Sequence, residues 1–145
     1  MLLLGLAVFI ASIVAAFNYI LETSKTSAVY QAYDYFILLQ AQQQLDRLTY
    51  RLHLASIDPK TIQPSPEEDL GLREQVGITW SRFDILTSGE NGERLRLMSG
   101  LPEFKTKMIE ALTQLETTPD DPKTDYYLWF TKLQQLSHEF SKFSG

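Results

Sequence analysis

The feature that most constrains this chain is an uninterrupted apolar stretch at its beginning. Residues 2–21 read LLLGLAVFIASIVAAFNYIL, with no charged side chain and Asn18 as the only strongly polar residue. A helix of about 20 residues is long enough to cross a hydrocarbon core of about 30 Å. Within that core every backbone amide and carbonyl must be bonded inside the segment, as in a helix. Residues 1–22 are therefore predicted to form a transmembrane helix that is retained as a signal anchor, with Tyr19 at the interface.

A cleaved signal peptide is the alternative for the same stretch. Val14–Ala16 would serve as a small-residue cleavage site. However, no Lys or Arg precedes the apolar run, and the run exceeds the usual apolar region of about 7–15 residues. A retained anchor in the inner (cytoplasmic) membrane is therefore favoured, and residues 23–145 are expected in the periplasm. Lys25, just beyond the span, is an argument for the opposite orientation.

Composition restricts the chemistry that the rest of the chain can perform. The 145 residues carry 13 basic and 18 acidic side chains, a net charge of -5, so no basic surface is expected to recruit nucleic acid. The absence of cysteine excludes disulfides, zinc–thiolate sites and cysteine nucleophiles. Only two histidines are present, too few for most metal sites or catalytic triads. We expect no enzyme in this chain, no catalytic residue and no metal or cofactor.

The first segment after the anchor has the apolar spacing of a helix. Residues 26–56 contain no Gly or Pro, so this helix can continue directly from the membrane helix. It ends at the following loop, because Pro59 and Pro64 cannot lie in a helix interior. Its apolar residues alternate at spacings of three and four, which is a heptad pattern: Leu38, Ala41, Leu45, Leu48, Leu52 and Ala55.

A second helix is predicted from Ser65 to Thr87. Ser65 suits the N-cap and Pro66 the first helical position, and the acidic residues of Glu67–Asp69 suit the positive end of the helix dipole. The sequence SGENG should end the helix at Gly89. The predicted buried stripe consists of Leu72, Val76, Thr79, Phe83 and Leu86.

Two further helices complete the predicted fold. After a short helical turn that closes at Gly100, the third helix runs from about Pro102 to Thr117. The fourth follows an N-cap at Asp121 and extends to the end of the sequence. Their apolar seams are Leu101, Phe104, Met108, Ala111 and Leu115 in the third helix, and Tyr126, Trp129, Leu133, Leu136, Phe140 and Phe143 in the fourth. Four amphipathic helices with short connections predict an all-α fold, an antiparallel four-helix bundle behind the membrane helix.

The even number of helices would return the chain toward the membrane. The fourth seam also continues to the last residues of the sequence, EFSKFSG. We therefore expect a second membrane helix and a cytoplasmic domain to follow Gly145.

The stretch WSRFDIL, residues 80–86, is interpreted first as a packing segment of the second helix. Its expected core residues are Trp80, Phe83, Ile85 and Leu86. Arg82 and Asp84 are two positions apart and point to different sides of the helix, so they do not form a site by themselves. Each charge is expected to pair with a neighbouring helix or to face solvent. Arg82 could reach Asp46 or Glu110, and Asp84 could meet Arg47 or Arg51.

The tract TWSRFDILTSGENGERL, preceded by LLQAQQQLDRLTYRLHLAS, resembles the extracytoplasmic sensory region of bacterial two-span signalling proteins. The resemblance lies in the Arg-Phe-Asp-aliphatic-Leu motif on a second helix, although Thr87 and Ser88 stand where relatives often have Trp and Arg. It implies an input domain placed ahead of a histidine kinase or of diguanylate cyclase and phosphodiesterase modules. Such a domain would pass helix displacements across the membrane.

This resemblance also implies partners. A homodimer is expected, because two parallel first helices would extend the heptad seam. The signal would be a small molecule or a periplasmic protein. The residues expected to line a ligand site are Arg47, Arg51, Trp80, Arg82 and Asp84. The glutamines of Gln40–Gln44 could line a pocket or a dimer seam, and a solvated face is favoured for them.

Three other functional classes stay open at this point, and one of them is a secreted enzyme or binder released by cleavage of the apolar segment. A chemoreceptor-type ligand-binding domain would have a similar bundle. A membrane-anchored structural bundle that docks a partner protein would have the same anchor and no signal output.

Overall fold

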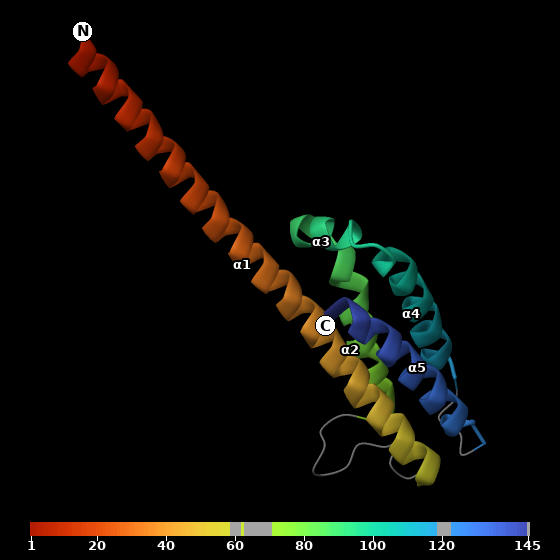
Figure 1. Cartoon of the computed structure of the whole chain (residues 1–145). Coiled ribbons are helices and arrows are strands. Elements are labelled where there is room, and N and C mark those ends of the chain that lie inside the picture. The colour runs from red at the N-terminus through yellow and green to blue at the C-terminus, as the bar shows by residue number, and fades with distance from the viewer. Residues whose placement is uncertain (59–61, 63–70, 119–122, 145) are drawn as a thin grey trace. The chain divides into compact units, whose positions relative to one another are not determined.

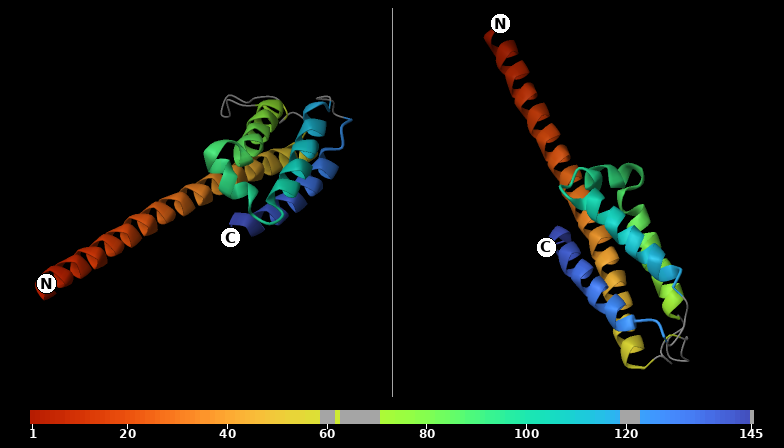
Figure 2. Two further views of the ribbon diagram at one scale, coloured as in Figure 1. Left: turned by 90° about the horizontal axis from the view of Figure 1, so that it is seen from above. Right: turned by 90° about the vertical axis from the view of Figure 1, so that its right-hand side faces the viewer.

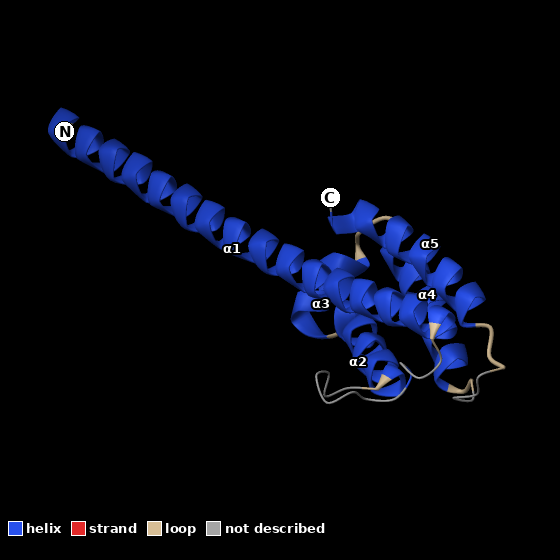
Figure 3. Ribbon diagram, turned by 90° about the horizontal axis from the view of Figure 1, so that it is seen from below, coloured by secondary structure: helices blue, strands red, loops and turns tan. Residues whose placement is uncertain are grey.

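The computed structural model describes residues 1–58, 62, 71–118 and 123–144, and all regular structure in these ranges is helical. The elements are α1 (Leu2–Ile57), α2 (Leu72–Asp84), the 3-10 turn η2 (Ile85–Thr87), α3 (Gly89–Arg96), α4 (Leu101–Glu116) and α5 (Tyr126–Ser144) (Figures 1 and 3). The chain divides into two compact units, residues 1–34 and 35–145. The predicted all-helical class with a long apolar helix at the N-terminus is confirmed.

The first unit is the N-terminal part of α1. Its apolar side chains are exposed, for example Phe9 at 63% and Phe17 at 61%. The Ser12 hydroxyl in the apolar stretch is bonded within the helix, since it donates to the Val8 carbonyl at 2.9 Å, which lowers its cost in an apolar environment. By length and composition this helix is suited to crossing a membrane, a property that signal sequences share. The predicted continuation of the apolar segment into the next helix without a break is confirmed, because α1 reaches Ile57.

The second unit has a core built from the predicted seams. The six residues predicted on the first seam are all buried, with exposed fractions from 0 to 3%. The predicted stripe of α2 and η2 is buried as well, and α4 buries every residue of its seam. In α5, four seam residues are buried and two are half-buried: Tyr126, Leu133, Leu136 and Phe140 belong to the first group, Trp129 and Phe143 to the second.

Within this second unit, neighbouring helices run in opposite directions. Helix α2 packs along α4, and α4 packs against α5. Gln42 bonds Ser137 and His53 stacks on Phe130, so higher numbers on α1 meet lower numbers on α5. The two views of Figure 2 show the same alternation for α2, α4 and α5. Helix α5 therefore ends at the end of the unit where Tyr35 lies.

The predicted helix starts were wrong for two helices. Helix α2 begins at Leu72 after the extended residue Gly71 (φ -74°, ψ 173°), so its N-cap is not Ser65; residues 65–69 lie outside the described residues. Helix α5 begins at Tyr126, and Asp125 caps it by accepting a hydrogen bond from the Leu128 amide at 3.0 Å. Asp121, the predicted cap, also lies outside the described residues.

The connection between α2 and α4 is more helical than predicted. The second helix ends where predicted, because η2 closes at Thr87 and Ser88 is extended. Gly89 then opens α3 with a φ of +68°. Gly100 precedes α4 with a φ of +83°, a backbone conformation that glycine tolerates best. The predicted third helix is confirmed to within about one residue at each end, the usual uncertainty of helix boundaries.

Candidate functional site

The WSRFDIL stretch forms the end of α2 and the η2 turn. Phe83 and Leu86 are almost completely buried, and Trp80 is half-buried with its indole N–H donating to Thr113 Oγ1 of α4 at 3.3 Å. Ile85, predicted to lie in the core, is 54% exposed, and that prediction was wrong. The reason is angular, since a residue two positions after buried Phe83 points to the opposite side of the helix.

Phe83 belongs to an aromatic cluster that joins three helices. Its ring lies 4.9 Å from that of Phe140 on α5 in an edge-on arrangement, and 6.4 Å from that of Phe104 on α4. Phe104 and Phe140 are stacked at 5.4 Å. These separations are typical of favourable aromatic pairs. The central aromatic residue of the motif therefore holds α2, α4 and α5 together.

The two charged residues of the motif contact other groups than predicted. Arg82 Nη1 donates to Gln40 Oε1 on α1 at 3.4 Å, rather than to Asp46 or Glu110. The backbone carbonyl of Asp84 accepts a hydrogen bond from Lys105 Nζ at 2.6 Å. Lys105 also donates to Thr87 Oγ1 at 2.9 Å. Ser88 Oγ donates to the same Asp84 carbonyl at 3.2 Å. A lysine at the C-terminal end of α2 also complements the helix dipole.

The antiparallel register of α1 and α2 explains the misplaced charge pairs. Gln40 lies level with Arg82, and Gln44 lies level with Thr79 and Gln75. Residues further along α1 must therefore lie level with the beginning of α2. Asp46 is therefore displaced from Arg82 toward the beginning of α2. Arg47 and Arg51 are displaced from Asp84 in the same direction. Asp84 is exposed at the end of α2, which agrees with the solvent-facing alternative and not with a pairing to Arg47 or Arg51.

A first polar cluster joins α1 to α2, and it consists of Gln44, Gln75 and Thr79. Gln75 Nε2 donates to Gln44 Oε1 at 2.9 Å, and Thr79 Oγ1 lies 3.3 Å from the Gln44 carbonyl. Gln75 is 4% exposed and Thr79 is fully buried. Buried amides and hydroxyls are costly unless bonded. This α1–α2 cluster therefore favours one relative position of the two helices.

A second polar cluster joins α1 to α5, and it consists of Gln42, Asp46 and Ser137. Gln42 Nε2 donates to Asp46 Oδ1 at 2.9 Å and to Ser137 Oγ at 2.7 Å. Ser137 Oγ donates in turn to Asp46 Oδ1 at 2.7 Å. Hydrogen bonds to a carboxylate are stronger than those between neutral groups. This α1–α5 cluster fixes the axial position of α1 against α5.

The glutamine run therefore does not form the solvated face that the sequence favoured. Gln40 and Gln44 contact α2, Gln42 contacts α5, and Gln43 is exposed. Sequence reasoning missed the bonding partners Gln75, Thr79 and Ser137. The available signal was the presence of polar residues on or beside otherwise apolar stripes.

The five residues predicted to line a ligand site do not come together in one place. Arg47 is exposed on α1, Arg51 is 9% exposed, and Asp84 is exposed at the end of α2. Trp80 turns toward α4, whereas Arg82 turns toward α1. Their role in ligand binding stays a prediction. The five side chains do not line one compact pocket together.

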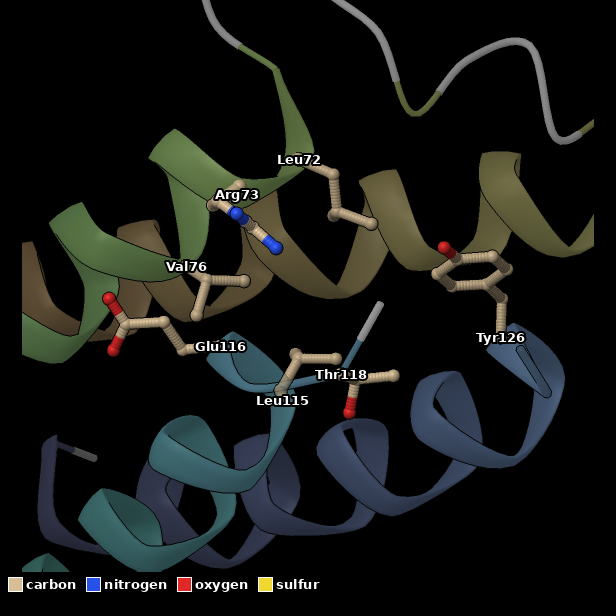
Figure 4. A pocket seen from close by; sticks show the side chains of 7 residues that line it. All are labelled: Leu72, Arg73, Val76, Leu115, Glu116, Thr118 and Tyr126. Atoms are coloured by element: carbon tan, nitrogen blue, oxygen red, sulfur yellow. The ribbon is translucent and has the colours of Figure 1, made fainter. Parts of the chain in front are cut away.

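Of the five residues, Asp84 lines an open groove of about 400 Å³ along α4, and two other cavities involve none of them. A cavity of about 10 Å³ lies between α2, α4 and the start of α5, a volume that suits at most one water molecule. Figure 4 shows the side chains around it. Its lining residues are Leu72, Arg73, Val76, Leu115, Glu116, Thr118 and Tyr126. An open groove of about 840 Å³ lies between the beginning of α4 and the end of α5. An ion pair of 3.0 Å between Lys107 and Glu139 joins the two helices there.

Neither grouped metal ligands among the described residues nor similarity to known proteins indicates what chemistry this chain performs. Among residues 1–58, 62, 71–118 and 123–144, no three His, Asp or Glu side chains gather as metal ligands would. Comparison with protein-family models, curated proteins and solved structures found no match for this chain. The most distinctive arrangement of the described residues is thus the pair of polar clusters that hold α1 between α2 and α5.

We expect Gln75→Leu to lower the free energy of unfolding by about 1–3 kcal/mol, because Gln44 Oε1 loses its buried donor. The double variant Gln44→Leu/Gln75→Leu should recover most of this loss, since both partners become apolar. Chemical denaturation followed by circular dichroism measures both effects. Gln134→Leu, at an exposed position of α5, is the matched control and should change stability by less than about 0.5 kcal/mol. Equal losses for the single and double variants would contradict this account of the α1–α2 cluster.

Proposed function

We propose that this chain is the periplasmic signal-sensing input region of a membrane-bound bacterial signal-transduction receptor. Residues 1–22 would anchor it in the inner membrane, and α1, α2, α4 and α5 would form an antiparallel four-helix sensor bundle. The output would be a histidine kinase or an enzyme of cyclic-di-GMP metabolism. The observation that most supports this proposal is that α1 is one helix from the apolar segment to the two polar clusters.

The mechanism would be a small shift between α1 and α5. The α1–α5 cluster contains hydrogen bonds of 2.7 and 2.9 Å, and such bonds weaken steeply with distance and misalignment. A displacement of about 1–2 Å, typical of helix shifts in switching proteins, would break the present set. Because α1 continues into the apolar segment, an axial shift of this helix would reach the membrane.

The proposed partners are the membrane, a second copy of the chain, and a small molecule or a periplasmic protein as the signal. A chemoreceptor-type ligand-binding domain is the second candidate. The open groove beside α4 and α5 favours it, because amphipathic ligands suit a groove with apolar residues such as Phe104 and charged residues such as Lys142. The coding sequence beyond Gly145 would distinguish the output modules of the two candidates.

Compartment is the first property to test. The chain contains no cysteine, so Thr106→Cys, at an exposed position of α4, introduces a single reactive thiol. We expect a membrane-impermeant maleimide to label this thiol in cells whose outer membrane is permeabilised and whose inner membrane is intact. Leu133→Cys, at a fully buried position, is the control and should react only after denaturation. Labelling of Thr106→Cys that requires disruption of the inner membrane would contradict the proposal.

A further inference from the structure

The seam expected to join two first helices is occupied within the subunit itself. Leu38, Leu45 and Leu52 are 0–3% exposed because they pack into the core of residues 35–145. A dimer through that seam would require the core to open. Any contact between two copies along α1 must therefore use another face of the helix.

Helix α1 has a second stripe on the side that faces away from this core. We name it the outer stripe, and it consists of Phe36, Gln43, Arg47, Tyr50, Leu54 and Ile57. Phe36, Tyr50 and Ile57 are 52, 58 and 69% exposed, and Gln43 and Arg47 are exposed as well. Three large exposed apolar side chains on one side of a helix, interspersed with polar ones, suit an interaction surface.

The spacing of the outer stripe points to a second copy of this chain as the occupant. Phe36, Gln43, Tyr50 and Ile57 are seven positions apart, with Arg47 and Leu54 at the intermediate heptad positions. A strict seven-residue repeat keeps one stripe facing a partner helix that wraps around it. In a parallel pair of identical helices each residue of the stripe lies beside its own counterpart.

We propose that the outer stripe is a homodimer interface in which two α1 helices pair in parallel. The parallel direction rests on the proposed function, since two copies anchored in one membrane leave it in the same direction. Tyr50, Leu54 and Ile57 form the apolar layers of this pair. Gln43 forms a polar layer, of the kind that fixes register and oligomeric state in parallel coiled coils.

The charges beside the stripe complement one another across the twofold axis. In the heptad register, Arg47 occupies a core position that lies next to Asp46 of the partner subunit. Both hydrogen bonds that Asp46 accepts within its own subunit use Oδ1. Its Oδ2 is thus the oxygen that receives the guanidinium of the partner's Arg47. Symmetry produces this ion pair twice.

The length of the stripe sets the expected strength of the dimer. From Phe36 to Ile57 the helix rises by roughly 32 Å, or three heptads. So short a pair is weak by itself, but anchoring both copies in one membrane raises their effective concentration. The dimer should therefore be tested with the full chain in lipid vesicles.

Disulfide cross-linking of single-cysteine variants tests the interface. Gln43→Cys and Tyr50→Cys place thiols on the outer stripe, whereas Thr106→Cys on α4 and Lys132→Cys on α5 place them at exposed positions elsewhere. After mild oxidation in vesicles at a low protein-to-lipid ratio, we expect about tenfold more covalent dimer for the first two variants than for the controls. Similar yields at all four positions would mean random collision and would overturn the proposal.

A charge reversal provides the second readout. Arg47→Glu in the Gln43→Cys background places two carboxylates beside each other across the interface, so the cross-linked fraction should fall about fivefold. Lys142→Glu in the same background makes the same charge change at an exposed position of α5 and should leave the fraction unchanged. An unchanged fraction in both variants would overturn the Asp46–Arg47 contact. Because vesicles report dimerisation whatever the orientation or output in cells, failure here is distinguishable from failure of the proposed function.

Discussion

Replacing Phe140 by alanine should lower the free energy of unfolding of residues 35–145 by about 3–5 kcal/mol. Phe140 is fully buried, and its ring lies 4.9 Å from that of Phe83 and 5.4 Å from that of Phe104. The substitution removes an aromatic ring that touches two other helices and leaves a cavity which the rigid helix backbones cannot close. The loss would be a large part of the stability of a typical domain, about 5–15 kcal/mol. Urea denaturation of the full chain in detergent, followed by near-ultraviolet circular dichroism, measures it.

Tyr127→Ala is the matched control for this prediction. Tyr127 lies on the same helix but is 64% exposed, so its truncation should change stability by less than about 1 kcal/mol. A similar loss for both variants would mean that the aromatic cluster does not carry the packing of α5. A loss below about 1 kcal/mol for Phe140→Ala would have the same meaning.

The core of the second unit could be predicted from the sequence because helical packing has one dominant signal. An apolar residue every three or four positions places a continuous stripe on one side of a helix. Leu45, Met108 and Leu133 were all identified in this way and are fully buried. No knowledge of the partner helix was needed, since burial requires only that some neighbour covers the stripe.

The helix starts could not be predicted, because several residues in each loop satisfy the same capping rules. Ser65 followed by Pro66 has the pattern of a helix N-terminus, yet α2 begins at Leu72 after Gly71. In the sequence before α5, Asp121 and Asp125 both precede helix-forming residues; Asp125 caps α5, and Asp121 lies outside the described residues. Capping chemistry is local, whereas the position at which a helix begins also depends on where its stripe can pack.

The contacts between helices could not be predicted, because they depend on register. Arg82 has acidic residues within a plausible reach in the sequence pattern, but the antiparallel alignment of α1 and α2 brings Gln40 beside it. The same alignment separates Arg47 and Arg51 from Asp84 and disperses the predicted ligand-lining set. Register follows from how the core side chains interlock, and periodicity along one helix carries no information about it.

The outer stripe of α1 is a second case in which periodicity alone could not predict a contact. A seven-residue repeat on α1 is visible in the sequence at two different phases, one through Leu45 and Leu52 and one through Gln43 and Tyr50. Periodicity alone does not tell which phase packs inside the subunit. Burial of the first and exposure of the second decide this point, and they turn an expected dimer seam into a different, testable face.

Two glycines should respond to the same substitution with opposite signs. A Cβ atom added at Gly92 of α3 would overlap the carbonyl carbon of Thr87 and would lie 2.7 Å from its carbonyl oxygen. Because both contacts are with backbone, no side-chain rotation relieves them, and α3 must move away from the η2 turn. Leu95, which is 1% exposed, would leave the core with it. We therefore expect Gly92→Ala to cost about 2 kcal/mol or more of unfolding free energy.

Gly77→Ala is the opposing case, in the interior of α2. A Cβ atom there has no heavy atom within 4 Å, so the substitution only reduces the backbone freedom of the unfolded chain. Alanine is favoured over glycine inside a helix by about 1 kcal/mol, and the variant should be more stable by up to that amount. Thermal denaturation of the two variants beside the parent chain measures both shifts. If Gly92→Ala also raised the free energy of unfolding, α3 would not approach Thr87 this closely in solution. The chain would then run from the WSRFDIL stretch through α3 to α4 along a different path.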